Sequence, residues 1–288
     1  FDFTDDLFSI TGGLDVWHVA VSGSDETGDG TEENPFATIQ KGIDMALDGN
    51  TVLVHPGTYS TPGQYEAINF NGKPIYLLSE TGPENTIIDA QSQSSVISFV
   101  NGESYDSVIE GFTITGGETG GGGAGIRCIG TSPTIKRCII KNNHAIGGGA
   151  PGGGIFCDGD GSIASPTLMS CLIAGNSATI GGGIYLDDNS PALIINCTIT
   201  GNSAAIYGGG ISSDYSNASI WNSIIGENGE SNIHVINWDI SITYSVVDGG
   251  WDGEGNLDIN PIFVDPGNGD FHLSDYSPCI GAGTTTLD

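Results

Sequence analysis

Basic side chains are scarce in this chain, and most of them fall in one short stretch. Lysine and arginine number 6 against 35 aspartates and glutamates, and four of the six lie between residues 127 and 141. An outward-facing lysine or arginine can bind a carboxylate or, after losing its own proton, remove one from a neighbouring carbon. The candidate catalytic residues are Lys136, Lys141 and Arg127, and the candidate substrate-binding residues are Glu110 and His144.

A second interpretation of these cations needs no catalysis, because they can simply offset part of a strongly acidic surface. The formal net charge of the chain is -29 at pH 7. Such a charge repels nucleic acid and anionic membrane surfaces. We therefore expect no nucleic-acid partner, and no apolar stretch is long enough to be a transmembrane segment.

The carboxylates suggest calcium as a cofactor, although the sequence does not require one. Hard cations prefer carboxylate and carbonyl oxygens, and residues 25–33 bring several acidic side chains together around Gly28 and Gly30. The spacing is not that of an EF-hand, and an acidic solvated turn explains the segment equally well. The candidate metal ligands are Asp25, Asp29 and Glu32.

The elements that must position these side chains come from a repeat in the middle of the chain. Each copy opens with Gly-Ile, continues into a short apolar strand that contains Cys or Ser, and closes with Asn. The closing asparagines are 33, 26 and 26 residues apart. The four copies run from Gly125 to Asn143, from Gly154 to Asn176, from Gly183 to Asn202 and from Gly210 to Asn228.

Strands this short cannot bury a face alone, so the copies must stack into a parallel β-helix, an all-β solenoid with a shared interior. Equivalent residues then form columns, and we predict Cys138 over Cys171 over Cys197, and Cys128 over Cys157. A spacing of about 4.8 Å between strands would permit disulfides, although small buried thiols also pack well there. We favour thiols, and we interpret the Asn column as turn architecture.

Some strand positions that should face outward are apolar in the later copies. A strip of this kind is covered either by the chain's own terminal segments or by another molecule. The second alternative would give a cell-surface partner or self-association into fibres. The candidate interface residues are Met169, Leu172, Ile195, Trp221 and Ile224, and the candidate covering residues are Phe1, Phe3, Leu7, Phe8 and Ile10, with Trp251, Ile262 and Phe263.

The ends of a solenoid need caps, and the sequence offers one at the N-terminal side. Apolar residues at helical spacing follow Asn34-Pro35, so we predict a short capping helix over residues 35–47. The chain then divides into an N-terminal extension (1–16), a parallel β-helix that includes this helix (17–247) and a C-terminal closing segment (248–288).

Besides the repeat, six segments carry a resemblance to known proteins: Val19 to Asp25, Asn34 to Lys41, Val52 to Tyr59, Asn260 to Asp265, Gly269 to Leu273 and Ser277 to Gly283. Together with the repeat, they resemble the pectate-lyase-like superfamily of right-handed parallel β-helix proteins, especially exported bacterial β-helix repeat proteins. The resemblance extends from Trp17 to Gly283, and it implies a right-handed coil and an extracellular or cell-surface location.

Polysaccharide lyases of that superfamily place a catalytic lysine among calcium-binding aspartates, and this chain cannot be matched to that arrangement residue by residue. We therefore expect an exported surface or extracellular-matrix protein that mediates adhesion, glycan contact or self-assembly without catalysis. The alternative is a calcium-assisted polysaccharide lyase that acts on an acidic glycan.

Overall fold

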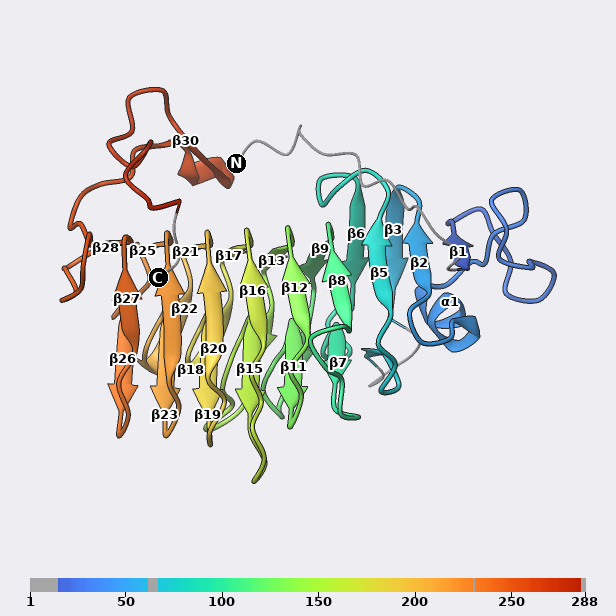
Figure 1. Ribbon diagram of the computed structural model, residues 1–288, viewed down its shortest axis with the longest axis horizontal. Coiled ribbons are helices and arrows are strands. Elements are labelled where there is room, and N and C mark those ends of the chain that lie inside the picture. Colours follow the sequence, from blue (N-terminus) through green and yellow to red (C-terminus); the bar gives the residue numbers. More distant parts are fainter. Residues whose placement is uncertain (1–14, 62–66, 230, 286–288) are drawn as a thin grey trace.

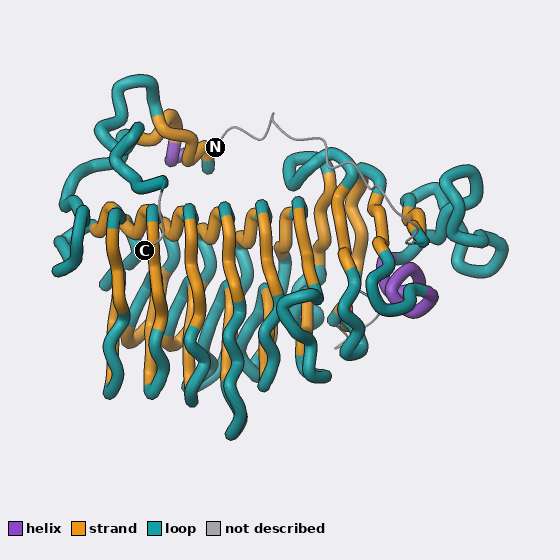
Figure 2. The backbone as a smooth tube through the Cα atoms, viewed as in Figure 1, coloured by secondary structure: helices purple, strands orange, loops and turns teal. Residues whose placement is uncertain are grey.

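The computed structural model describes residues 15–61, 67–229 and 231–285, and short strands stack in it along one axis to form a β-helix (Figure 1). Each turn of the coil contributes one strand to each of several parallel sheets, and loops connect the sheets (Figure 2). The fold is therefore the parallel solenoid that the repeat predicts. The candidate covering residues between Phe1 and Ile10 lie outside the described residues.

In the described residues, four parallel sheets build the coil. The first contains β1 (Val16–Val19), β2 (Thr51–Val54), β5 (Tyr76–Ser79), β8 (Val108–Glu110), β12 (Thr134–Lys136), β16 (Thr167–Met169), β20 (Ala192–Ile195), β24 (Ala218–Trp221) and β27 (Ser241–Thr243). The second contains β3 (Gly57–Ser60), β6 (Thr86–Asp89), β9 (Thr113–Thr115), β13 (Ile139–Lys141), β17 (Leu172–Ala174), β21 (Thr198–Thr200), β25 (Ile224–Gly226) and β28 (Val246–Val247).

The third sheet is the one that carries the candidate site described below. It contains β4 (Ile68–Asn69), β7 (Ile97–Phe99), β11 (Ile126–Ile129), β15 (Ile155–Asp158), β19 (Ile184–Asp187), β23 (Ile211–Asp214) and β26 (Ile233–Ile236). The fourth contains β10 (Glu118–Thr119), β14 (His144–Ala145), β18 (Ser177–Ile180) and β22 (Ser203–Tyr207).

The predicted cysteine columns are confirmed. Cys128 and Cys157 are register partners in the third sheet. The paired strands β13, β17 and β21 align Cys138, Cys171 and Cys197, each of which is at most 1% exposed. All of these cysteines are free thiols. Burial, followed by the neighbouring Cys171, raises the pKa of the Cys138 thiol, so this side chain packs in the core as a neutral thiol.

The asparagine column is also confirmed, as a hydrogen-bonded ladder. The Oδ1 of Asn176 accepts from both the backbone N and the Nδ2 of Asn143, each at 3.0 Å. Asn202 and Asn228 repeat this arrangement one and two turns further along. The ladder ends at Asn232, whose Oδ1 accepts both bonds from Asn228 at 3.1 Å. Each inward amide therefore satisfies buried backbone groups of the preceding turn.

The capping helix exists, but it is shorter than the predicted range of residues 35–47. Helix α1 spans Ile39–Met45, with Thr38 as its N-cap. The carboxylate of Asp25 accepts hydrogen bonds from the backbone N of Ala37 and Thr38 and from the Thr38 hydroxyl, at 2.7 to 3.0 Å. These bonds hold the residues before Ile39 in an extended conformation, so the helix starts later. Its buried side covers the first turn of the coil (Figure 1).

The C-terminal segment returns along the second sheet and lies over the apolar strip at Leu172 and Ile224. It contains the antiparallel pair β29 (Phe263–Asp265) and β30 (Asp270–Leu273), with a 3-10 turn, Pro266–Asn268, between them. Phe271 lines small cavities together with Leu172 and with Ile224. The backbone of Thr284 exchanges two hydrogen bonds of 2.9 Å with the side chain of Asn222.

At these positions the chain's own tail covers the strip. The alternative, that another molecule covers it, therefore has no support at these positions. Of the candidate covering residues in the tail, Phe263 lines a small cavity with Ile224, Trp251 packs against the core, and Ile262 is exposed. On the first sheet, Met169, Ile195 and Trp221 form the predicted in-register column, and Ile195 is buried. None of the helices in the described ranges is long and apolar enough to cross a membrane.

Candidate functional site

The basic stretch does not form one site, so the predicted catalytic patch is wrong as a cluster. Arg127 lies on β11 in the third sheet, Lys136 on β12 in the first, and Lys141 on β13 in the second. The predicted substrate-binding residue His144 lies on β14 in the fourth sheet. Residues that are close in sequence thus point away from different sides of the coil.

Between Lys136, Lys141 and His144 the chain makes two sharp bends that the residue types do not predict. Arg137, between β12 and β13, has φ of 47°, and Asn142, between β13 and β14, has φ of 54°. Both residues occupy the left-handed region, in which one residue turns the chain. Glu110 is the register partner of Lys136, as predicted, but its ion pair is with Arg137 at 3.6 Å. A pair this exposed contributes little to stability.

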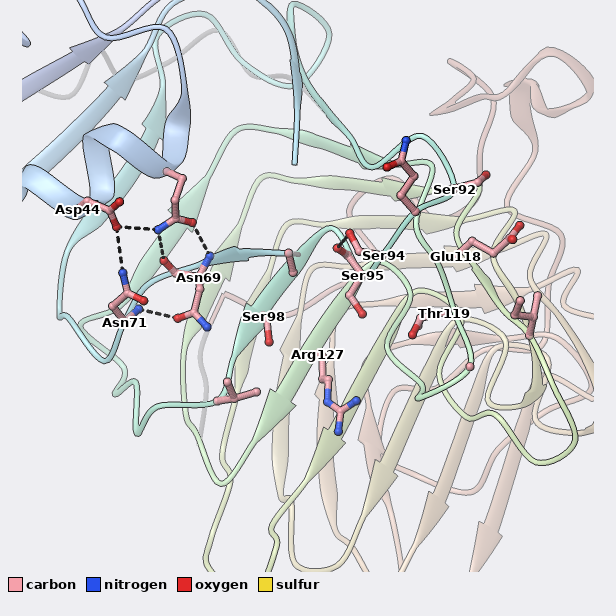
Figure 3. Close-up of a pocket in the computed structure, with 16 residues that line it drawn as sticks. Asp44, Asn69, Asn71, Ser92, Ser94, Ser95, Ser98, Glu118, Thr119 and Arg127 are labelled. Carbon is pink, nitrogen blue, oxygen red and sulfur yellow. Dashed lines mark hydrogen bonds between the residues drawn. The ribbon is translucent and has the colours of Figure 1, made fainter. Parts of the chain in front are cut away.

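Arg127 instead belongs to a polar groove of about 920 Å³ on the outside of the third sheet (Figure 3). Its walls come from α1, from the third sheet and from the strand β10 with its following loop. The lining residues are Gln40, Asp44, Ala67, Asn69, Asn71, Ser92, Gln93, Ser94, Ser95, Ser98, Val100, Glu118, Thr119, Gly120, Arg127 and Ile146. Most of them carry amide or hydroxyl groups.

The floor of the groove is one outward column of the third sheet. Asn69, Ser98 and Arg127 are consecutive register partners on β4, β7 and β11. Their neighbours Ile97 and Ile126 are fully buried in the core. Because side chains alternate across a strand, burial of the isoleucines directs the polar residues between them outward. The core therefore fixes which way the groove residues point.

The wall nearest α1 is held by a network of amide hydrogen bonds. The Gln40 side chain accepts from the backbone N of Asn69 at 2.9 Å and donates to its carbonyl at 3.0 Å. Asp44 accepts from the side chains of Gln40 at 3.0 Å and Asn71 at 3.1 Å. Asn101 donates to Asn69 Oδ1 at 2.8 Å. These contacts hold polar groups in place before a ligand arrives, which lowers the entropy lost on binding.

Arg127 is the cationic group of the groove, and Glu118 and Thr119 stand on the opposite wall from α1 (Figure 3). The Nη1 of Arg127 donates to the carbonyl of Gly121 at 3.2 Å, which ties the side chain to the loop after β10. A guanidinium carries five N–H donors, so it can also bind ligand oxygens. Arg127 is the one predicted catalytic residue that lines this groove.

Beyond Arg127 the same outward column changes character. Phe156 and Tyr185 follow it in register, 6% and 9% exposed, with stacked rings 5.8 Å apart. Burial, followed by the nearby Asp187, raises the pKa of Tyr185 to about 12. Ser212 and His234 come next, and among the described residues Ser212 Oγ and His234 Nδ1 are buried without a hydrogen-bond partner. The outward column of the third sheet is thus polar over β4, β7 and β11, where it forms the groove floor, and aromatic over β15 and β19.

The predicted metal ligands have other roles or lie apart. Asp25 uses both carboxylate oxygens to hold the start of α1. Asp29 accepts from the backbone and hydroxyl of Thr31, and these bonds lower its pKa. Glu32 is exposed. Within the described ranges, no three or more His, Cys, Asp or Glu side chains are grouped so that they could hold a metal ion. Calcium binding stays a prediction.

Comparisons with known proteins support the fold. A family model described as "Protein of unknown function (DUF1565)" matches residues 21–67. The structure is similar to a pectate lyase, Pel9A, with a TM-score of 0.52 and 16% identity over 96% of this chain and 94% of that one. It is also similar to a GH136 lacto-N-biosidase from Eubacterium ramulus, with a TM-score of 0.54 and 13% identity over 80% of this chain and 50% of that one.

A third similar structure is XylC, solved with xylose, with a TM-score of 0.50 and 11% identity over 84% of this chain and 67% of that one. No curated protein matches the sequence. Identities this low show the fold alone. The chain therefore has a parallel β-helix fold similar to that of the pectate lyase Pel9A, which is the fold that the sequence resemblance implied.

Proposed function

We propose that this protein binds a neutral glycan in the groove over β4, β7 and β11 without cleaving it. The observation that carries the proposal is the groove itself, an open polar channel of about 920 Å³ whose floor and walls are held by a preformed hydrogen-bond network. Such a role suits an exported protein at the cell surface or in the extracellular matrix, where adhesion depends on contact with polysaccharide.

The lining supports a sugar ligand. Amides and hydroxyls such as those of Asn69, Ser98 and Thr119 donate and accept hydrogen bonds, as sugar hydroxyls do. The three similar structures are a pectate lyase, a lacto-N-biosidase and XylC in complex with xylose. Each of these β-helix proteins is thus linked to a carbohydrate.

Charge favours a neutral glycan over an acidic one. Asp44 and Glu118 outnumber Arg127 in the groove, and the whole chain has a formal charge of -29. A polyuronate carries a carboxylate on each residue, so this field repels it. The separation of Arg127, Lys136 and Lys141 onto three sheets removes the cationic cluster on which the lyase alternative rested.

Calorimetric titration of the full chain with xylotetraose, cellotetraose and tetragalacturonate tests the proposal. We expect a neutral tetrasaccharide to bind more tightly than tetragalacturonate. Arg127→Ala should weaken that binding about 10-fold to 100-fold, because it removes charge-assisted hydrogen bonds. Arg137→Ala, which removes a cation from a different side of the coil, is the matched control and should leave the affinity unchanged.

Two outcomes would contradict this proposal. Equal loss of binding in both arginine variants would show a general charge effect instead of a site in the groove. Calcium-dependent ultraviolet absorbance from unsaturated products on polygalacturonate, abolished by Arg127→Ala, would establish the lyase alternative.

A further inference from the structure

Three titratable side chains form one hydrogen-bonded line at the N-terminal edge of the first sheet. His18 lies on β1, His55 directly follows β2, and Glu80 directly follows β5. The Nδ1 of His18 is 3.1 Å from the Nε2 of His55, and the Nδ1 of His55 is 2.9 Å from Oε2 of Glu80. The line therefore links the first three strands of this sheet side by side.

The number of protons decides whether this line can exist. A carboxylate only accepts, so His55 must donate its Nδ1–H to Glu80. The contact between the two imidazoles then needs one proton between their facing nitrogens. A neutral pair meets this condition, and so does a pair in which one ring is an imidazolium. When both rings are imidazolium, two N–H groups face each other and the hydrogen bond is lost.

The surroundings resist the second proton. Burial, followed by the charge of His55, lowers the pKa of His18 below its ordinary value of 6.5, while Glu32, Glu80 and Glu33 act in the opposite direction. Tyr59 also contacts this group, since its hydroxyl donates to the His55 carbonyl at 2.8 Å. A lowered histidine pKa means that the unfolded chain binds protons first. Stability is therefore lost as pH falls from about 6.5 towards the pKa of folded His18.

Strand β1 is the element that this loss affects. It is the first strand of the first sheet and pairs there with β2, while its other side is hydrogen-bonded to Gly30 and Phe36. We propose that the line from Glu80 through His55 to His18 is an acid-sensitive latch that fastens β1 to the coil. Opening it exposes the edge of β2, and an unpaired strand edge is a surface on which another strand can add. The latch is independent of the glycan groove.

Residue-resolved hydrogen exchange of the full chain at pH 7.5 and pH 5.0, corrected for intrinsic exchange rates, tests this inference. The reporter amides are Thr51 and His55, which donate to the Asp15 and Val19 carbonyls. The reference is the Leu172 amide in the middle of the coil, which donates to the Cys138 carbonyl. We expect reporter protection to fall about tenfold more than the reference at pH 5.0, which corresponds to the loss of about one hydrogen bond.

Variants separate the latch from general acid sensitivity. His18→Gln should keep the reporters protected at both pH values, because an amide can turn either its oxygen or its nitrogen towards His55. Glu80→Gln removes a charge that favours the imidazolium, so the opening should move to lower pH. His272→Gln alters another histidine that contacts a carboxylate, far along the chain, and should retain the wild-type response.

The inference is overturned if reporter and reference amides respond equally to acid in the wild-type protein. It is also overturned if His18→Gln loses protection at pH 5.0 as the wild type does.

Discussion

The inward and outward columns of the same strands obey different rules. Inside the coil, residue types repeat from turn to turn, as the Asn143–Asn176–Asn202–Asn228 ladder and the cysteine columns show. Outside the third sheet, the column changes at nearly every turn, from Asn69 and Ser98 to Arg127 and then to aromatic rings. The residues that repeat from turn to turn are therefore those that stacking requires. The residues that differ from turn to turn give each part of the outer surface its own binding properties.

The largest expected effect is on the inward side. Asn176→Ala removes an amide that accepts two hydrogen bonds from Asn143 and donates to Asn202 and to the Ile140 carbonyl. Buried groups left without partners should lower the free energy of unfolding by about 4 kcal/mol. Urea denaturation measures this, with the exposed Asn217→Ala as the control that should change little. A loss below about 1 kcal/mol would show that the inward ladder does not contribute to stability as proposed.

A smaller difference in unfolding free energy is expected between two positions of the outward column. Phe156→Ala empties a covered position that is 6% exposed, and should cost about 3 kcal/mol of unfolding free energy. Ser98→Ala, in the same column but in the open groove, should change stability by less than about 0.5 kcal/mol. The same urea experiment compares them. Similar losses at both positions would mean that the groove floor is as structural as the aromatic part.

The smallest effect has the opposite sign. Asp158, Asp187 and Asp214 are register partners, and burial, followed by the charges of Asp158 and Asp214, raises the pKa of Asp187. Folding therefore favours the protonated form, and this contribution is lost as pH rises. Asp187→Asn keeps the oxygen that accepts from Asp188 and should stabilise the protein at pH 7 by at most about 0.5 kcal/mol, since solvent screens the charge.

The gain should vanish near pH 3, where the carboxyl is protonated in both states. Thermal unfolding at the two pH values measures it. The control is Asp270→Asn, because hydrogen bonds from His272 lower the pKa of Asp270 and no gain is expected there. Destabilisation by Asp187→Asn at pH 7 would show that the acidic column is held by contacts that need its charge.

The fold could be predicted because the interior imposes one residue type on each column. Ile135, Cys138 and Ile140 were assigned inward from their spacing, and each is at most 1% exposed. The start of α1 was misplaced because the deciding bond comes from Asp25, which is remote from the helix in sequence. Local spacing carries no information about such a partner.

The candidate site could be predicted only in one residue, Arg127. Its floor is assembled from β4, β7 and β11, and one wall comes from α1, so its members come from distant parts of the sequence and share no motif. One signal was present, because the residue after the opening Ile of each copy differs between Arg127, Phe156 and Tyr185. Lys136 and Lys141 fall on different sheets because the chain bends at Arg137 between them, and a bend made by one residue leaves no motif in the sequence.

The six cysteines differ in their accessibility to reagents. Five sulfurs are sealed in the coil, and only Cys279 in the C-terminal segment is partly accessible. Alkylating reagents attack the thiolate, which burial suppresses. Alkylation of any of the other five sulfurs therefore requires the coil to open. Because alkylation is irreversible, the modified cysteines show afterwards that the coil was open.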